Sequence, residues 1–341
     1  MTTSLSRRTL VMAGAGLCTT PLLVACAARP QLAKPVSVGA LFAGRVDDKG
    51  FMESGWRGLE RARTELGAQT TFIDRIEPKK ELLVAALTQL AQSGVALVVA
   101  HGAQNNEAGA EVAARFPAVK FVVTQGAVTA PNLASYDVLQ EESAYLAGVL
   151  AALTTRTGVV GHMSGIRVRP GLKGRAAYAA GVLATNPQVK LLTNFSGNQD
   201  DNALSQRVAL AQMNAGADII FTMLNAGRDG VTQACRTKGT RQIGNVIDWV
   251  KVDPVVFTAS AIADVSIGVF EAVRDTQAGA FPAGNIRKVG LANTQAVRLS
   301  MADDVPAAVK ARVAEVSQGI TSGRIKVPET FDGPEFPTPA A

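Results

Sequence analysis

The sequence has few residues that could supply metal, disulfide or nucleophilic chemistry. Its 341 residues include three cysteines and two histidines, and aromatic residues make up only 5% of the chain. It contains no P-loop and no GxSxG nucleophile motif. Its basic residues form no arginine-rich run, so the formal net charge of +6 gives no support for nucleic-acid binding. These absences argue against a zinc enzyme, a P-loop protein and a nucleic-acid-binding protein.

The first 26 residues have the features of an export signal. Arg7 and Arg8 precede an apolar stretch that is too short and too interrupted for a comfortable membrane span. That stretch ends in the sequence LVAC at residues 23–26, which resembles a bacterial lipobox. We therefore predict that Cys26 carries a diacylglycerol and anchors an exported protein to the cell envelope membrane, on its periplasmic or extracellular face. The paired arginines resemble a twin-arginine signal more weakly.

The three cysteines fit this processing. Cys18 would be removed with the signal segment and Cys26 would be lipidated, which leaves Cys235 alone. The mature chain then has no intramolecular disulfide and depends on its hydrophobic core. Residues 27–35 show no apolar periodicity and are expected to form a tether.

From residue 36 onward the sequence alternates short apolar runs, typical of buried strands, with longer stretches of helical apolar spacing. Strands followed by helices in this way require crossover connections, which favours parallel sheets covered on both faces. We predict an α/β protein with two doubly wound, Rossmann-like lobes. The expected strands span 36–42, 70–73, 95–101, 120–124, 134–138, 159–163, 189–195, 218–223, 242–247 and 255–259. The expected helices span 51–66, 80–93, 107–115, 143–154, 172–184, 204–215, 227–236 and 265–276.

The candidate binding residues are those that follow the strands, because ligands of open α/β sheets bind at the carboxyl ends of the strands. Carboxylates, amides and occasional aromatic rings at these positions suit reversible recognition of a flat polar molecule: carboxylates accept from diols, amides pair with heterocycle edges, and rings stack. The candidates are Arg45, Asp47, Asp48, Phe51, Gln104, Asn105, Gln125, Gln199, Asn225, Gly227, Asp248 and Trp249.

Several of these candidates could instead have structural roles. Asp47 or Asp48 either lines a cleft or caps the helix that begins near Phe51. His101 and His162 lie in apolar strands and are expected to be buried core residues. Other structural alternatives are a cap at Asn105 or Asn106, a cap at Asp200 or Asp201, a core position for Phe51, and a tight turn at residues 225–227. A glycosidase-like carboxylate pair is also compatible with the sequence.

Several motifs resemble the basic membrane lipoprotein (BMP, PnrA-like) family. The sequence DDKGF at residues 47–51, followed by Trp56, is similar to the family's DDKSFN…W opening, and residues 142–148 resemble its EAYLAG segment. The resemblance covers roughly residues 36–274, and further matches follow in the family's order at 157–161, 186–187, 216–221 and 226–227. It implies a periplasmic-binding-protein type 1 fold and a substrate-binding lipoprotein of an ABC importer, a role that many members fill for purine nucleosides.

The resemblance also implies roles for individual residues. It places Asp47 or Asp48 and Phe51 in the first binding loop, Gly227 beside the ligand, and Asp248 on the ribose hydroxyls. The chain departs from the family at four positions. Val246 and Trp249 replace the first acid and the glutamine of the family's GVDxDQ motif, and Gln199 and Ala263 fall near its stacking aromatic and its lysine.

The expected lobes are residues 36–138 with 262–288, and residues 139–261 with 289–337. We expect the protein to act as a monomeric solute-binding protein without cofactor, metal or catalytic activity. It would close on a purine nucleoside, nucleobase or similar heterocycle and deliver it to an ABC permease. A nucleoside-processing enzyme and a ligand sensor on the same scaffold are the competing hypotheses.

Overall fold

The computed structural model of the chain describes residues 35–338. The predicted signal segment, the lipidation site Cys26 and nearly all of the predicted tether lie outside the described residues. Within them, no helix is long and apolar enough to cross a membrane.

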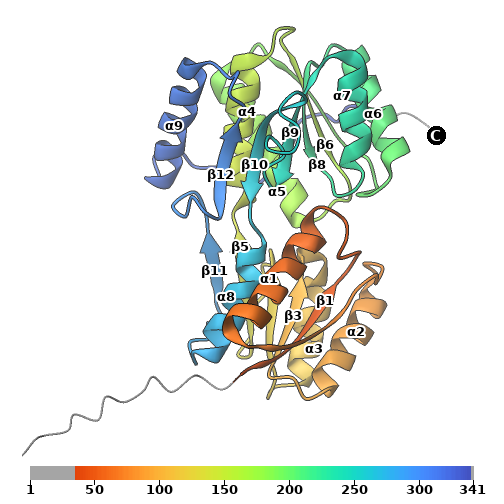
Figure 1. Cartoon of the computed structure of the whole chain (residues 1–341), viewed down its shortest axis with the longest axis vertical. Helices are drawn as coiled ribbons and strands as arrows, with labels where there is room; N and C mark the ends of the chain where they lie inside the picture. The colour runs from red at the N-terminus through yellow and green to blue at the C-terminus, as the bar shows by residue number, and fades with distance from the viewer. Residues whose placement is uncertain (1–34, 339–341) are drawn as a thin grey trace, which may run out of the picture. The chain divides into compact units, whose positions relative to one another are not determined.

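The first sheet is built mainly from the N-terminal part of the described chain. Among the described residues its strand order is β11-β5-β4-β3-β1-β2, and every pairing is parallel. Helices α1 and α8 cover one face, and α2 and α3 cover the other (Figure 1). The strands are β1 (Ser37–Phe42), β2 (Gln69–Ile73), β3 (Leu97–His101), β4 (Lys120–Thr124), β5 (Leu133–Val138) and β11 (Ile286–Val289). The helices are α1 (Phe51–Leu66), α2 (Lys80–Gln92), α3 (Asn106–Arg115) and α8 (Ser266–Gln277), with a 3-10 turn η1 at Ala103–Asn105.

The second sheet has the order β12-β10-β9-β8-β6-β7 among the described residues, and only its β10–β12 pair is antiparallel. Helices α4 and α5 cover one face and α6 and α7 the other, while α9 packs beside α4 (Figure 1). Its strands are β6 (Val159–Ser164), β7 (Lys190–Phe195), β8 (Ile219–Met223), β9 (Arg241–Val246), β10 (Phe257–Ala263) and β12 (Val297–Met301). Its helices are α4 (Gln140–Thr154), α5 (Arg169–Thr185), α6 (Asn202–Asn214), α7 (Arg228–Lys238) and α9 (Ala307–Thr321).

The apolar runs of the sequence form the core strands for the expected reason. Parallel strands that are buried on both faces need continuous apolar sequence, and every residue of β3, β5, β8 and β10 is buried. Separate hydrophobic clusters fill the first sheet's surroundings and the two faces of the second sheet. The fold class is therefore the expected one, with two doubly wound sheets.

Close packing of α4 on α5 depends on two glycines. A Cβ atom on Gly148 would overlap the carbonyl oxygen of Tyr178, and one on Gly181 would overlap the carbonyl oxygen of Tyr145. The two helices therefore approach each other at glycine positions on both sides.

A buried ion network lies where the chain passes from β5 into α4. Lys173 of α5 is only 2% exposed and pairs with Asp137 at the end of β5 and with Glu141 at the beginning of α4. Arg169 Nη1 also lies 2.9 Å from Asp137 Oδ2. The network joins an element of the first sheet to a helix of the second.

The expected boundaries differ from the observed ones in a few places. Helix α4 begins at Gln140, three residues before the expected start, and β10 spans Phe257–Ala263 rather than residues 255–259. Strands β11 and β12 and helix α9 are not predicted from the apolar pattern. All four residues of β11 are exposed or half-buried in this edge strand, so its sequence lacks the apolar run of a central strand.

Candidate functional site

Loops at the carboxyl ends of both sheets line a cavity of about 510 Å³, hereafter the first cavity. This volume lies within the range of about 300–1,000 Å³ that is typical of small-molecule sites. Its apolar lining includes Phe51, Met52, Ile76, Ile166, Val168, Pro170 and Met223. Its amide side chains are Gln104, Gln140, Asn198, Gln199, Asn225 and Asn245, and its charged side chains are Arg45, Arg75, Glu77 and Asp200.

Phe51 is the aromatic residue of the first cavity, and a buried histidine supports it. The Phe51 ring is stacked on the imidazole of His101, with ring centroids 4.3 Å apart. His101 Nε2 lies 2.9 Å from the Phe51 carbonyl oxygen, and Nδ1 lies 2.8 Å from Thr124 Oγ1. Burial lowers the pKa of His101 to about 4, so the imidazole is neutral. His101 is therefore a core residue that positions the aromatic ring.

Asp48 fixes the start of α1. Its carboxylate accepts hydrogen bonds from the backbone N–H groups of Gly50 (2.8 Å), Met52 (3.0 Å) and Glu53 (3.0 Å). Asp48 is 2% exposed, and burial raises its pKa while these hydrogen bonds oppose that rise. Asp47 is exposed and pairs with Arg45 at 2.9 Å. Of the two adjacent acids, Asp48 is the one whose carboxylate caps α1, from two residues before the N-cap Gly50.

The first turn of α1 meets the loop between β8 and α7 of the second sheet. The Phe51 N–H donates to Asn225 Oδ1 at 3.4 Å, and Arg228 Nη1 donates to the Lys49 carbonyl oxygen at 3.4 Å. The carbonyl oxygen of Gln199 accepts from the N–H groups of Asn225 (3.1 Å) and Gly227 (3.0 Å), which joins two loops of the second sheet at the first cavity.

Gly227 allows this close approach of the two loops. A Cβ atom at Gly227 would lie 2.8 Å from the Gln199 carbonyl oxygen. The Gln199 side chain packs against Gly165 and occupies the space that a Cβ atom would fill there. Its Oε1 is buried without a hydrogen-bond partner among the described residues.

A second cavity of about 430 Å³ contains Asp248 and Trp249. Asp248 Oδ1 is buried without a partner among the described residues, and Oδ2 lies 3.6 Å from Lys251 Nζ. The Trp249 ring is 7% exposed and packs against the Arg228 guanidinium, whose central carbon lies 3.3 Å from the ring centroid. Burial lowers the pKa of Arg228 to about 10. Trp249 Nε1 donates to the Asn245 carbonyl oxygen at 3.0 Å.

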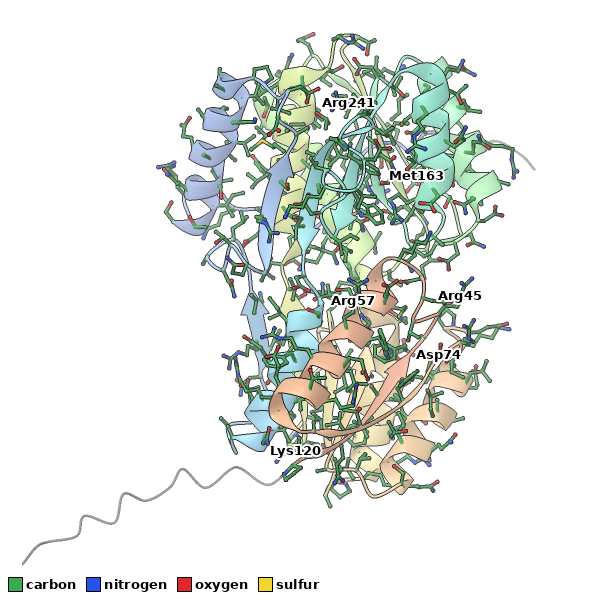
Figure 2. The ribbon with its side chains drawn as sticks, in the orientation of Figure 1. Arg45, Arg57, Asp74, Lys120, Met163 and Arg241 are labelled. Carbon is green, nitrogen blue, oxygen red and sulfur yellow. The ribbon has the colours of Figure 1, made fainter. Side chains whose placement is uncertain are left out.

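The two cavities lie on opposite faces of the first turns of α1. Phe51 and Met52 line the first cavity, whereas Gly50, Glu53, Ser54 and Arg57 line the second. At 100° per residue these two sets occupy opposite sides of a helix. Arg45, in the loop before α1, lines the first cavity, and Arg57, in α1 itself, lines the second (Figure 2).

The twelve candidates from the sequence thus fall into three groups. Arg45, Phe51, Gln104, Gln199 and Asn225 line the first cavity, and Asp248 and Trp249 line the second. Five line neither cavity: Asp47, Asp48, Asn105, Gln125 and Gly227. Asn105 Nδ2 donates to the carbonyl oxygens of His101 (3.0 Å) and Gly102 (3.1 Å), and Gln125 hydrogen-bonds both backbone groups of Val138.

Several lining residues are absent from the sequence-based candidates. Gln140 follows β5, residues 75–78 follow β2, and residues 166, 168, 170 and 171 follow β6, so the strand-end rule applies to all of them. These residues are apolar or are isolated polar residues, and nothing else in the sequence marks them as binding residues. Among the described residues, no group of three or more His, Cys, Asp or Glu side chains could hold a metal ion.

The fold is that of the two-lobed periplasmic-binding-protein type 1 solute-binding proteins. A solved solute-binding protein of an ABC transporter system from Aeropyrum pernix matches it with a TM-score of 0.78 at 23% identity, over 87% of this chain and 95% of that one. The chain matches the Bmp family, described as PnrA-like substrate-binding proteins of ABC transporters, over residues 35–330. It belongs to that family, which confirms the resemblance drawn from the motifs.

Two curated relatives are named for what they bind. An ABC transporter nucleoside-binding protein of Lactococcus lactis is 26% identical over 84% of this chain and 87% of that protein. A purine-binding protein of Brucella abortus is 22% identical over 88% of this chain and 84% of that protein.

Proposed function

We propose that the chain is the lipid-anchored solute-binding component of an ABC importer and that the first cavity holds a purine base or a similar planar polar heterocycle. The observation that carries this proposal is the meeting of the Phe51 ring with several side-chain amides in one cavity. An aromatic face stacks on a planar ring, and amides both donate to and accept from its polar edge. The relatives named for nucleoside and purine binding agree with this ligand class.

The position of Asp248 favours a base over a nucleoside. The family resemblance assigns this acid to the ribose hydroxyls, yet it lines the second cavity, across α1 from Phe51. The carboxylates of the first cavity are the exposed Glu77, which pairs with Lys79 at 2.6 Å, and the exposed Asp200, which accepts from the Ala226 N–H at 3.1 Å. Neither is a buried acceptor for a diol, so a ribose gains little in this cavity.

Transport requires binding and release without chemistry on the ligand. A ligand in the first cavity contacts loops of both sheets, so it favours the closed arrangement by its greater affinity for that arrangement. We propose that the closed monomer presents the ligand to a permease and releases it unchanged. Export by the N-terminal signal and anchoring through Cys26 would place this exchange outside the cytosol.

Calorimetry of the purified protein with hypoxanthine, adenine and guanine, and with inosine, adenosine and guanosine, tests the proposal. We expect at least one base to bind at least tenfold more tightly than its nucleoside. Chromatography after prolonged incubation is expected to recover inosine intact. Absence of binding across the panel would refute the ligand class, and release of hypoxanthine from inosine would indicate an enzyme.

A variant of Phe51 tests the stacking contact. Stacking of a base on an aromatic side chain contributes about 1–3 kcal/mol, so Phe51→Ala is expected to weaken binding of the preferred base at least fivefold. Phe72→Ala is the matched control, because Phe72 is an exposed aromatic residue of β2 outside the first cavity. Equal affinities of the two variants would remove Phe51 from the site.

A further inference from the structure

The polar groups of the first cavity differ in whether the protein already uses them. Asn225 Oδ1 accepts from the Phe51 N–H at 3.4 Å. Asn198 Oδ1 accepts from the N–H groups of Asp200 (2.8 Å) and Asp201 (3.1 Å). These amide oxygens hold loops in place, so they have less capacity left for a ligand.

Gln140 differs from both because its amide nitrogen is buried and unpaired. Gln199 Oε1 is also unpaired, but it is an acceptor packed against Gly165. Gln140 lines the first cavity and is only 5% exposed. Its Nε2 has no hydrogen-bond partner among the described residues. A buried polar group left without a partner costs about 1–3 kcal/mol, and folded proteins contain few of them. A ligand that brings a hydrogen-bond acceptor into the cavity would remove this cost.

The backbone around Gln140 is held firmly. Gln125 Nε2 donates to the Val138 carbonyl oxygen at 2.9 Å, and the Val138 N–H donates to Gln125 Oε1 at 2.7 Å. The Leu139 N–H donates to the Val289 carbonyl oxygen at 2.8 Å. The amide of Gln140 is therefore presented from a fixed point, which reduces the entropy lost on binding.

The acidic residues that follow Gln140 are already engaged. Glu141 is ion-paired with the buried Lys173, and Glu142 Oε2 accepts from the Leu291 N–H at 2.6 Å. Among Gln140, Glu141 and Glu142, Gln140 is thus the residue that lines the first cavity, and its Nε2 has no hydrogen-bond partner among the described residues.

We propose that Gln140 is a specificity-determining residue, whose side-chain amide donates a hydrogen bond to a ring nitrogen or carbonyl oxygen of the bound heterocycle. This inference rests on the proposed function and adds a requirement to it. The ligand must present an acceptor on the edge that faces the beginning of α4. A heterocycle with only donors or C–H groups on that edge would leave the amide unpaired and bind less tightly.

Two substitutions separate the donor from the shape of the side chain. Gln140→Met keeps the length of glutamine but cannot form the hydrogen bond, and Gln140→Glu offers only acceptors when ionised at pH 7.5. Each is expected to weaken calorimetric binding of hypoxanthine or adenine, whichever the wild type binds more tightly, at least tenfold. Gln233→Met, on the exposed side of α7, is the matched control and is expected to bind like wild type.

Thermal unfolding of the ligand-free proteins is a second measurement. The proposal and a purely structural role for Gln140 predict opposite changes in the unfolding temperature. Because Gln140→Met removes an unpaired buried amide, it is expected to unfold at the wild-type temperature or above. A lower unfolding temperature would show that the protein itself needs the amide, and would overturn the proposal.

The two proposals fail differently. If the wild type binds a base and both Gln140 variants bind it equally well, only the role of Gln140 is refuted. If the wild type binds no member of the panel, the proposed function fails, and the ligand-free unfolding temperatures still decide whether the Gln140 amide is unpaired.

Discussion

The Phe51 carbonyl oxygen lies 2.9 Å from His101 Nε2, and the rings of the same two residues are stacked. A carbonyl oxygen can only accept, so Nε2 carries the hydrogen. Thr124 Oγ1 accepts from the Gly102 N–H at 3.1 Å and donates to His101 Nδ1. The neutral imidazole with hydrogen on Nε2 satisfies every one of these contacts. Protonation of Nδ1 would place a donor against the donating Thr124 hydroxyl.

This arrangement predicts loss of stability in mild acid. The ordinary pKa of histidine is 6.5, and burial lowers it to about 4 for His101 and to about 3 for His162. At a pH between 6.5 and each lowered pKa, the histidine binds more protons in the unfolded chain than in the folded one. The free energy of unfolding therefore falls as the pH falls below 6.5. For His101 the loss is on the order of 3 kcal/mol by pH 4, at 1.4 kcal/mol per pKa unit.

Urea unfolding between pH 7.5 and pH 4.5 measures this effect. The variant His101→Gln has an amide that does not titrate and can still donate to the Phe51 carbonyl oxygen. It is expected to lose less stability than the wild type between pH 6.5 and pH 4.5, whatever its stability at pH 7.5. Identical slopes for the two proteins would show that His101 does not contribute to the acid sensitivity.

The adjacent acids Asp47 and Asp48 are expected to differ in their effect on stability. Asp48→Ala removes the acceptor for three backbone N–H groups at the start of α1 and should cost about 1–2 kcal/mol, as for other helix caps. Asp47→Ala removes only exposed ion pairs, with Arg45 at 2.9 Å and with Arg75 at 3.7 Å, and should leave the midpoint of urea unfolding unchanged. Equal losses in the two variants would contradict the assignment of the cap to Asp48.

Apolar periodicity was sufficient to predict most of the fold. It predicts the bounds of α1 and β4 as observed, because α1 buries one face and β4 lies in the middle of a parallel sheet. Strand ends also predicted Phe51, Gln199 and Asn225 as neighbours in one cavity. Such patterns follow from burial, because the positions that face the core carry apolar residues.

The position of Asp248 could not be predicted in the same way. Asp248 follows β9 as Asn225 follows β8, yet the two line different cavities. The last residue of β9, Val246, has a backbone φ of 68°, a left-handed conformation that a β-branched residue rarely adopts. Neither this turn nor the unpaired state of Gln140 Nε2 follows from local sequence, because both depend on packing between distant segments.

Alanine is expected to lower stability at the two glycines of the contact between α4 and α5, and to raise it at a helical glycine outside that contact. Gly148→Ala and Gly181→Ala would force the helices apart at the carbonyl oxygens of Tyr178 and Tyr145. Each is expected to destabilise the protein by about 1–3 kcal/mol, as overpacking does elsewhere.

Gly268→Ala in α8 is the control for this pair. The nearest atom to a Cβ there, Tyr136 Cβ, would be 3.5 Å away, so the better helix propensity of alanine should give a gain of about 0.5–1 kcal/mol. Chemical denaturation of the three variants measures the difference. A stabilised Gly148→Ala or Gly181→Ala variant would show that α4 and α5 do not need the close approach.

The buried network around Lys173 predicts a large loss when its cation is removed. Asp137 and Glu141 are 2% and 5% exposed, and both pair with Lys173. Lys173→Met would leave buried carboxylates with less compensation, which costs about 3–5 kcal/mol in other proteins. Urea unfolding should show a loss of this size, whereas Lys238→Met on the exposed end of α7 should show none.

A double variant identifies the cause of that loss. Burial raises the pKa of Glu141 and the Lys173 charge opposes the rise, so without the lysine this carboxylate is the unfavourable group. Adding Glu141→Gln to Lys173→Met removes its charge and should restore part of the lost stability, although Asp137 still pairs with Arg169 at 2.9 Å. If the double variant is no more stable than Lys173→Met alone, lost side-chain packing rather than unpaired charge explains the effect, and the network does not stabilise the passage from β5 to α4 electrostatically.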